Sequence, residues 1–484
     1  MNNLTQQELL LQAQGQFNKM LRAIGQHTQD GTRIDLVERD IFQRMLEASR
    51  SALAGFVAGA GDGDEGEGVE RAGRTLQRSE QPHRRIYHSV FGQIAIDRYV
   101  YAPGPKKQIA YAPVDARLGL PRGEYSYVLE DWLERLCVKE PFAEGVANLA
   151  ALLNLQPSVR TAEVLNRRMA EHAERFRLAQ TPAEVSAEAE ILVATADGTS
   201  VPMHADDRTS TPSNTAGPAA GTTRRAYVGA VYNIAPFVRQ AEDILDELFR
   251  EENAPRRPRP EEKRLWAEMA QGPEPSLLSG SERLFAELAM EVQARDPQRE
   301  RVLVCLMDGE RTLWDLQSQW LGRSVEILDF FHVLKRVREV AKLAEPGLPQ
   351  RAAWVERQVR DLLEGRVDTV IRRWGRLSVP HQTEELRSAL TYFKNNRARM
   401  RYDEYLAAGY PIGSGNAEGA CRNLVKDRMD GTGMKWKLDG ARAMLWTRAL
   451  YLNDEWDEFV EFRIQREQQQ LYSAKCQPSS HTAA

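Results

Sequence analysis

Residues 190–198 read E-I-L-V-A-T-A-D-G, and residues 301–309 read R-V-L-V-C-L-M-D-G. In both, a short apolar run rich in β-favouring side chains leads into an aspartate and a glycine. This pattern predicts a buried strand that ends at Asp197 and another that ends at Asp308. Open α/β sheets bind their ligands at the carboxyl ends of the strands. The two stretches therefore predict an α/β core with two carboxylates at one edge of its sheet.

A third acid lies in residues 410–436, which read Y-P-I-G-S-G-N-A-E-G-A-C-R-N-L-V-K-D-R-M-D-G-T-G-M-K-W. Proline and glycines open the stretch as a turn, and apolar residues then recur at three- and four-residue spacing, so we expect a helix with Glu418 in its first turn. Read alone, the stretch is as compatible with an ordinary amphipathic helix. Together with Asp197 and Asp308, Glu418 completes a set of oxygen ligands suited to two Mg²⁺ or Mn²⁺ ions, the pair that catalyses displacement at phosphorus.

A fourth motif follows in residues 325–333, V-E-I-L-D-F-F-H-V, which predict a strand that turns into a helix at Asp329 and His332. With this motif in place, the chain resembles insertion-sequence DDE transposases with an RNase H-like core, in the branch akin to Mutator and hAT elements. That branch carries Asp-Gly after its first and fourth strands and a Cys or Asp three residues before a His after its fifth. Its Glu follows a helical insertion. The resemblance covers at least residues 185–455.

The resemblance implies a metal-dependent enzyme that cleaves DNA at the ends of a mobile element and transfers the strands into target DNA. It implies that Asp197, Asp308 and Glu418 bind two divalent ions and are catalytic, and that Asp329 and His332 support them. A helix-start aspartate beside a buried histidine is also common as a purely structural pair. The partners would be double-stranded DNA, as terminal inverted repeats and as target, and a second copy of the chain, because two element ends must be held together.

Three other functions compete with this interpretation. An RNase H-like, structure-specific nuclease would cut DNA without joining it. A catalytically retired transposase would only bind DNA, although none of the acids is missing. A metal-dependent phosphatase is disfavoured by the basic helical block between residues 333 and 406. This block contains 16 Lys and Arg but only 10 Asp and Glu, and such an excess of positive charge suits contacts with the phosphates of a nucleic acid.

Composition agrees with a multidomain protein of a reducing cytoplasm, and the resemblance to insertion-sequence transposases implies a bacterial protein associated with the nucleoid. The 484 residues exceed what one core usually supports. Four scattered cysteines argue against zinc sites and disulfides, and the polar N-terminus does not resemble a signal peptide. The formal net charge of -4 does not exclude DNA binding, which depends on local patches.

We predict a mixed α+β and α/β fold in which a helical insertion interrupts an RNase H-like core, preceded by helical and small β regions. The third strand of the core is not assigned, and residues 240–295 are predicted to be largely helical. The predicted order is an N-terminal helical pair at 1–58, a flexible acidic linker at 59–83, a small β module at 84–120, a helical, helix-turn-helix-like region at 121–184, the first part of the core at 185–332, a basic all-helical insertion at 333–408, the end of the core with the Glu helix at 409–467, and a disordered tail at 468–484.

DNA contacts are expected from two basic regions. Ser158 caps an Arg-rich helix that follows a short turn, the outline of a helix-turn-helix, although a plain helical bundle has the same pattern. The basic block and the Glu helix supply further cations. The predicted DNA-binding residues are Arg160, Arg167, Arg168, Lys394, Arg397, Arg399, Arg401, Arg422, Lys426 and Lys435.

Overall fold

The chain forms two compact units. The computed structural model describes residues 4–71, 73–153, 155–181, 189–207, 223–250, 257–270, 278–344, 347–377, 384–413, 419, 421–431 and 433–473. One unit is built from Met1–His172 and Trp456–Ala484, and the other from Ala173–Glu455. None of the helices within the described ranges combines the length and the apolar character needed to cross a membrane.

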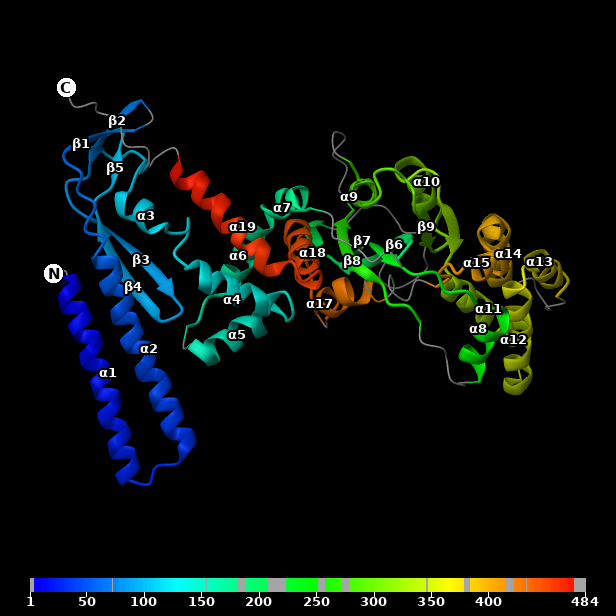
Figure 1. Ribbon diagram of the computed structural model, residues 1–484, viewed down its shortest axis with the longest axis horizontal. Coiled ribbons are helices and arrows are strands. Elements are labelled where there is room, and N and C mark those ends of the chain that lie inside the picture. The colour runs from blue at the N-terminus through cyan, green and yellow to red at the C-terminus, as the bar shows by residue number, and fades with distance from the viewer. Residues whose placement is uncertain are drawn as a thin grey trace. The chain divides into compact units, whose positions relative to one another are not determined.

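The first unit is helical with two small antiparallel sheets. Helices α1 (Gln6–Gln29) and α2 (Ile34–Ala58) run side by side as a hairpin (Figure 1). One sheet has the order β1-β2-β5 and the other pairs β3 with β4. Their bounds are β1 Gly68–Arg71, β2 Arg74–Arg78, β3 His83–Ser89, β4 Gly92–Arg98 and β5 Tyr101–Ala102. The remaining helices are α3 Pro113–Leu118, α4 Tyr127–Cys137, α5 Phe142–Leu153, α6 Val159–Ala170 and α19 Trp456–Gln468, which runs on into a π-helical turn, Gln469–Ser473.

Capping residues set the helix starts as the sequence indicates. The backbone N–H of Glu8 donates to Thr5 Oγ1 while the N–H of Thr5 donates to the Glu8 carboxylate, so these two residues form a capping box at the start of α1. Ser158 caps α6 by accepting a hydrogen bond from the N–H of Thr161 at 3.0 Å. Helices α4, α5 and α6 pack on one another around a shared apolar cluster that includes Leu133.

Two segments predicted to be flexible are ordered over part of their length. Strands β1 and β2 form within residues 59–83, because the buried Tyr101 hydroxyl accepts the N–H of Glu65 and donates to the carbonyl of Gly66. In the tail, residues 469–473 are helical, and the Tyr472 hydroxyl donates to the carbonyl of Leu120 at 2.6 Å. The composition of these two segments gives no sign of hydrogen bonds to residues far away in the chain. Residues 474–484 of the predicted tail lie outside the described residues.

The second unit is a mixed five-stranded sheet with helices on both faces. The strand order is β10-β9-β6-β7-β8, in which β10, β9 and β6 are parallel while β7 is antiparallel to both β6 and β8. The strands are β6 Ile191–Pro202, β7 Thr223–Ile234, β8 Glu261–Met269, β9 Val302–Met307 and β10 Val325–Leu328. The helices are α7 Ala173–Ala179, α8 Ala241–Phe249, α9 Gly280–Arg295, α10 Arg311–Trp320, α11 Phe330–Ala344, α12 Leu348–Leu363, α13 Val367–Gly375, α14 Glu384–Asn396, α15 Tyr402–Ala407, α17 Asp427–Met429 and α18 Leu438–Leu452. Single turns lie at Ala205–Asp207, Arg397–Arg399 and, as π-helix, Arg422–Lys426.

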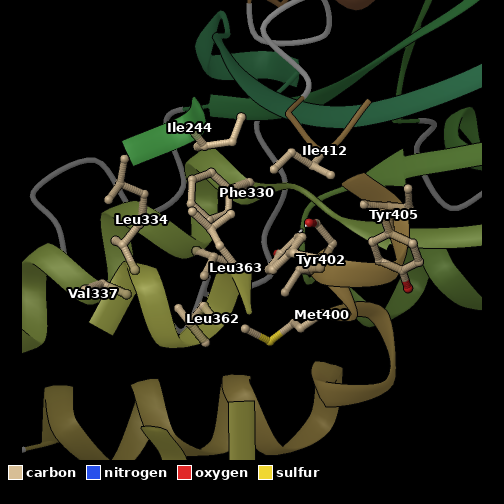
Figure 2. Packing of buried hydrophobic residues seen from close by; sticks show 14 of the residues in the cluster. Ile244, Phe330, Leu334, Val337, Leu362, Leu363, Met400, Tyr402, Tyr405 and Ile412 are labelled. Carbon is tan, nitrogen blue, oxygen red and sulfur yellow. Dashed lines mark hydrogen bonds between the residues drawn. The ribbon is translucent and has the colours of Figure 1, made fainter. Parts of the chain in front are cut away.

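Alternation along the strands divides the core into two layers. On β6, Ile191 and Val193 face one cluster, while Leu192 and Ala194 face the other. Helices α11, α12, α14 and α15 cover the first face. Figure 2 shows side chains of α11, α12 and α15 meeting there, with Phe330 above Leu363. Helices α9 and α10 cover the second face. This sheet order, three antiparallel strands followed by two strands parallel to the first, is consistent with an RNase H-like core.

Two predictions about the strands need correction. Residues 261–269 are β8 and not helix, because β8 pairs along β7 and the Asn453 side chain bonds both backbone groups of Leu265, at 2.8 and 3.2 Å. The strand predicted to end at Asp197 continues to Pro202. Its parallel partner β9 stops at Met307, but its antiparallel partner β7 continues beside it over the whole length.

Candidate active site

Three aspartates lie at the carboxyl edge of the parallel strands. The last register pairs join Ala196 to Met307 and Met307 to Leu328. The next residue in each of the three strands is an acid. Because neighbouring parallel strands keep their register, these acids are adjacent at one edge of the sheet. They are Asp197, Asp308 and Asp329.

Asp308 is held in a partly buried position beside Asp197. Its Oδ1 accepts the backbone N–H of Glu310 at 2.7 Å, and its carbonyl accepts Trp314 Nε1 at 2.7 Å. Burial raises the pKa of the Asp308 carboxyl, and the charge of Asp197 raises this pKa further. The two carboxylates therefore repel each other in a partly buried site, an arrangement that a bound cation would relieve.

The Asp329 and His332 pair stands at the start of α11. Asp329 is fully buried, and its Oδ1 accepts the N–H of Phe331 at 2.7 Å. Its Oδ2 lies 3.6 Å from His332 Nδ1. Hydrogen bonding to Asp329 raises the pKa of His332, and the charges of Asp329, Asp308 and Asp197 act in the same direction. The predicted turn from strand into helix is confirmed here, and the imidazole lies within the field of all three acids.

Helix α14 reaches the site from the segment predicted as the insertion. The Tyr392 hydroxyl is hydrogen-bonded to the backbone of Gly309, and burial followed by the charge of Asp308 raises the pKa of Tyr392. A Cβ at Gly309 would collide with the Tyr392 ring. The glycine after Asp308 is therefore required by the close approach of Tyr392, beyond any role in a turn.

Two further residues at the site were not predicted from the sequence as site residues. The buried Cys421 thiol donates a hydrogen bond to Asp197; burial raises the pKa of this thiol, and the charge of Asp197 adds to the effect. Arg225, on β7, forms an ion pair with Glu310 and packs against Gly198. No local motif marks either residue, since both reach Asp197 or its neighbours across long separations in the chain.

The third predicted ligand, Glu418, lies outside the described residues. Within the described ranges, no three His, Cys, Asp or Glu side chains are placed to hold a metal ion together. The donors that are described fit a hard divalent cation nonetheless, because Asp197 and Asp308 offer carboxylate oxygens from adjacent strands and one of them bears a raised pKa.

The predicted DNA-binding residues are distributed over both units. Arg160 on α6 is exposed, whereas Arg168 on the same helix forms an ion pair with the buried Glu130. On the second unit, Arg399 lies 2.6 Å from Glu326 and over the Trp314 ring. Exposed positions are also occupied by Lys394, Arg397, Arg401, Arg422, Lys426 and Lys435. Arg167 is partly exposed.

Arg399 and Arg401 share a basic cavity of about 800 Å³ with residues at the amino ends of β9 and β10. The other arginines that line it are Arg299, Arg301 and Arg323. The cavity therefore lies along the ends of the parallel strands opposite to those that carry Asp308. DNA contact by any of these side chains stays a prediction.

Comparison with known proteins adds little to this geometry. No protein-family model matches the sequence, and no curated protein matches it. Among solved structures, the chain is similar to the Drosophila P element transposase strand transfer complex, with 11% sequence identity and a TM-score of 0.23 over 70% of this chain and 81% of that chain. The function is therefore argued from the acids and their surroundings.

Proposed function

We propose that this protein is a DNA transposase of the DDE type, which cleaves DNA at the ends of a mobile element and joins the strands to target DNA. The observation that supports the proposal is the adjacent pair Asp197 and Asp308 at the carboxyl edge of a mixed sheet with strand order β10-β9-β6-β7-β8. Paired carboxylates at such an edge suit divalent ions and phosphoryl transfer.

In this proposal, Asp197, Asp308 and Glu418 hold two Mg²⁺ or Mn²⁺ ions. When bound, the ions would activate the attacking hydroxyl and stabilise the leaving 3′-oxygen of the DNA. The chain's own residues prepare the site. The N–H of Glu310 orients the Asp308 carboxylate, and the Cys421 thiol orients that of Asp197.

His332 would lie beside the scissile phosphate. Its pKa is raised, so the ring keeps its proton to higher pH than an ordinary histidine does and offers positive charge to a phosphate oxygen. Asp329, buried and anchored by the N–H of Phe331, would fix the orientation of the ring. Tyr392 closes one side of the site, where it leaves no space for a side chain at Gly309.

The test is divalent-ion-dependent cleavage and joining of labelled DNA from the flanks of the coding region. The wild type would be compared with Asp197→Asn, Asp308→Asn and Glu418→Gln. Asp315→Asn serves as a matched control, because Asp315 is exposed on α10 and pairs only loosely with Arg311, at 3.6 Å. We expect the wild type and the control to cleave and join, and the three acid variants to bind DNA without chemistry.

Other outcomes decide between the alternatives. Cleavage that survives Asp308→Asn and Glu418→Gln would contradict the site assignment. Cleavage by the wild type without any joined product would favour the structure-specific nuclease. DNA binding with no chemistry in any variant would favour the retired transposase.

A further inference from the structure

Arg225 reaches the acidic edge of the sheet from the face opposite to the acids. Along β6, Val193 lies on the face that α11 covers, and Asp197 continues this alternation, whereas Ala196 lies on the face of α9 and α10. On β7, Tyr227 packs on the same side as Ala196, and Arg225 precedes Tyr227 by two residues. The side chains of Arg225 and Asp197 therefore leave the sheet on opposite faces.

A glycine allows the Arg225 guanidinium to come close to Asp197 all the same. Gly198 directly follows Asp197, and a Cβ at Gly198 would collide with Nε and Nη2 of Arg225. The guanidinium thus lies against the bare backbone of Gly198. Burial raises the pKa of Asp308 and of Cys421, and the positive charge of Arg225 acts against this rise in both groups. The charge is therefore felt across the edge, on the face that carries the acids.

The guanidinium of Arg225 is only partly engaged. Arg225 is 42% exposed and forms an ion pair with Glu310, which stands at the start of α10. Within the described part of the chain, Glu310 is the one acceptor that the N–H groups of Arg225 reach. A guanidinium has five N–H donors in a planar fork, so most of this fork is open to a further acceptor. An ion pair with this exposure contributes little to stability, so the fold alone does not account for the placement of Arg225.

We propose that Arg225 binds a DNA phosphate adjacent to the scissile one, on the face of the sheet opposite to Asp197 and Asp308. The inference rests on the proposed function and adds a substrate contact to it. The scissile phosphate would lie beside the acids on one face. A strand that crosses the edge then presents its neighbouring phosphate to the other face, where Arg225 lies. A guanidinium binds phosphate oxygens through two parallel hydrogen bonds, and Glu310 holds the group in place before DNA binds.

Such a contact has a kinetic signature that separates it from the acids. The phosphate at Arg225 does not react, so Arg225 stabilises the bound DNA and the transition state equally. Loss of Arg225 should raise the DNA concentration that gives half-maximal cleavage. It should leave the single-turnover rate at saturating DNA unchanged. The acid variants, in contrast, should lose the rate itself.

The experiment measures binding of labelled DNA from the flanks of the coding region, with Ca²⁺ in place of Mg²⁺ so that the DNA is held without cleavage. Arg225→Gln should bind about tenfold more weakly than the wild type, and the slope of log K against log salt should fall by about 1. Arg225→Lys should keep the slope but recover only part of the affinity, because an ammonium does not form the two parallel hydrogen bonds. Thermal melts verify that both variants are folded.

DNA probes with one neutral phosphate locate the contact. Each phosphate near the end of the element is replaced in turn by an uncharged methylphosphonate. At one position, this replacement should weaken binding by the wild type about tenfold and leave binding by Arg225→Gln unchanged, since that contact is already lost. Arg311→Gln is the matched control, because Arg311 on α10 is exposed and pairs only loosely with Asp315, at 3.6 Å. The control should respond to every probe as the wild type does.

An affinity and a salt slope that Arg225→Gln leaves unchanged would overturn the proposal. So would an affinity that falls by the same factor on every probe, because the loss would then reflect total charge and not one contact. A slower rate at saturating DNA would place Arg225 with the acids and would equally contradict the proposal. Since binding is measured without chemistry, a wild type that binds DNA but does not cleave it would fail the proposed function alone.

Discussion

At the scale of single residues, the site contains a carboxyl whose charge is unfavourable in the absence of metal. Burial and the charge of Asp197 raise the pKa of Asp308 above its ordinary value of 3.8. A raised carboxyl pKa means that stability falls as pH rises from the ordinary value through the folded one. Asp308→Asn should therefore raise Tm at neutral pH without metal, by roughly 2–4 °C for about 1 kcal/mol, while it abolishes cleavage.

Calorimetry with and without Mg²⁺ tests whether the charge of Asp308 lowers Tm in the absence of metal. The ion should raise the Tm of the wild type and of the Asp315→Asn control, since binding to the folded state stabilises it. The ion should raise the Tm of Asp308→Asn much less. A lower Tm for Asp308→Asn in metal-free buffer would contradict the idea that the charge at this position is destabilising.

His332 should titrate above its ordinary pKa of 6.5 because it is hydrogen-bonded to the buried Asp329. The stability that this pair contributes is fully present below pH 6.5 and is lost as pH rises through the folded pKa. Asp329→Asn removes the largest cause of the raised pKa of His332, so this pKa should fall. Histidine NMR titration measures this directly, with His332→Gln to assign the signal.

A matched control for that titration is Asp40→Asn, which removes the partner of a different histidine, His27. The His332 signal should not move in that variant. A His332 pKa that is unchanged by Asp329→Asn would show that the pair is not coupled, and the assignment of Asp329 as the residue that orients the ring would fail.

The sequence revealed those residues of the site that stand at the end of an apolar run. Asp197, Asp308 and Asp329 each come after an apolar run, so alternation and strand register place them at one edge. Cys421 and Tyr392 could not be found this way, because each reaches the site only after a long excursion of the chain. Contacts between distant segments are decided by packing, for which a single sequence carries no local signal.

At the scale of elements, helix α6 carries one arginine that is exposed and another that is held in an ion pair with a buried carboxylate. Arg160 is exposed, so Arg160→Ala should weaken DNA binding and reduce the slope of log K against log salt by about 1. Arg168 is paired with the fully buried Glu130, so Arg168→Ala should lower stability by about 1–3 kcal/mol and leave the salt slope unchanged.

Filter binding over a salt series, together with thermal melts, distinguishes the two arginines. Ser158→Ala provides a further comparison, because it removes the cap of α6 and should cost about 1 kcal/mol without changing a charge. If Arg160→Ala leaves both the affinity and the slope unaltered, α6 does not contact the DNA backbone, and the region is the plain helical bundle.

Elements with strong local signals were predicted well, and those that depend on neighbours were not. The strand before Asp308 and the helix after Asp329 are both present. Residues 261–269 fall within the range 240–295, which the sequence predicts to be largely helical. They form a strand because β7 and Asn453 offer partners for their backbone groups, and tertiary context overrides such propensities.

At the scale of the whole molecule, the chain leaves its first unit after His172 and returns to it at Trp456. The second unit is thus inserted between two parts of the first. Helix α19 closes the first unit with a buried ion pair, Arg463 to Glu130, at 2.9 Å. Both side chains are fully buried, and Arg168 also pairs with Glu130, so loss of Arg463 removes one of the two cations that neutralise this buried carboxylate.

Truncation after Glu455 should therefore destabilise the first unit selectively. It removes Arg463 from the buried Glu130, and it removes Trp456 and Phe459 from the apolar interior. The second unit keeps its complete sheet and should melt as before. Truncation after Ser473 removes none of the described side chains and should change nothing. Calorimetry with hydrogen exchange read out by mass spectrometry assigns each transition to its unit. If the first unit keeps its protection after truncation at Glu455, α19 is only an accessory to a core that is already complete.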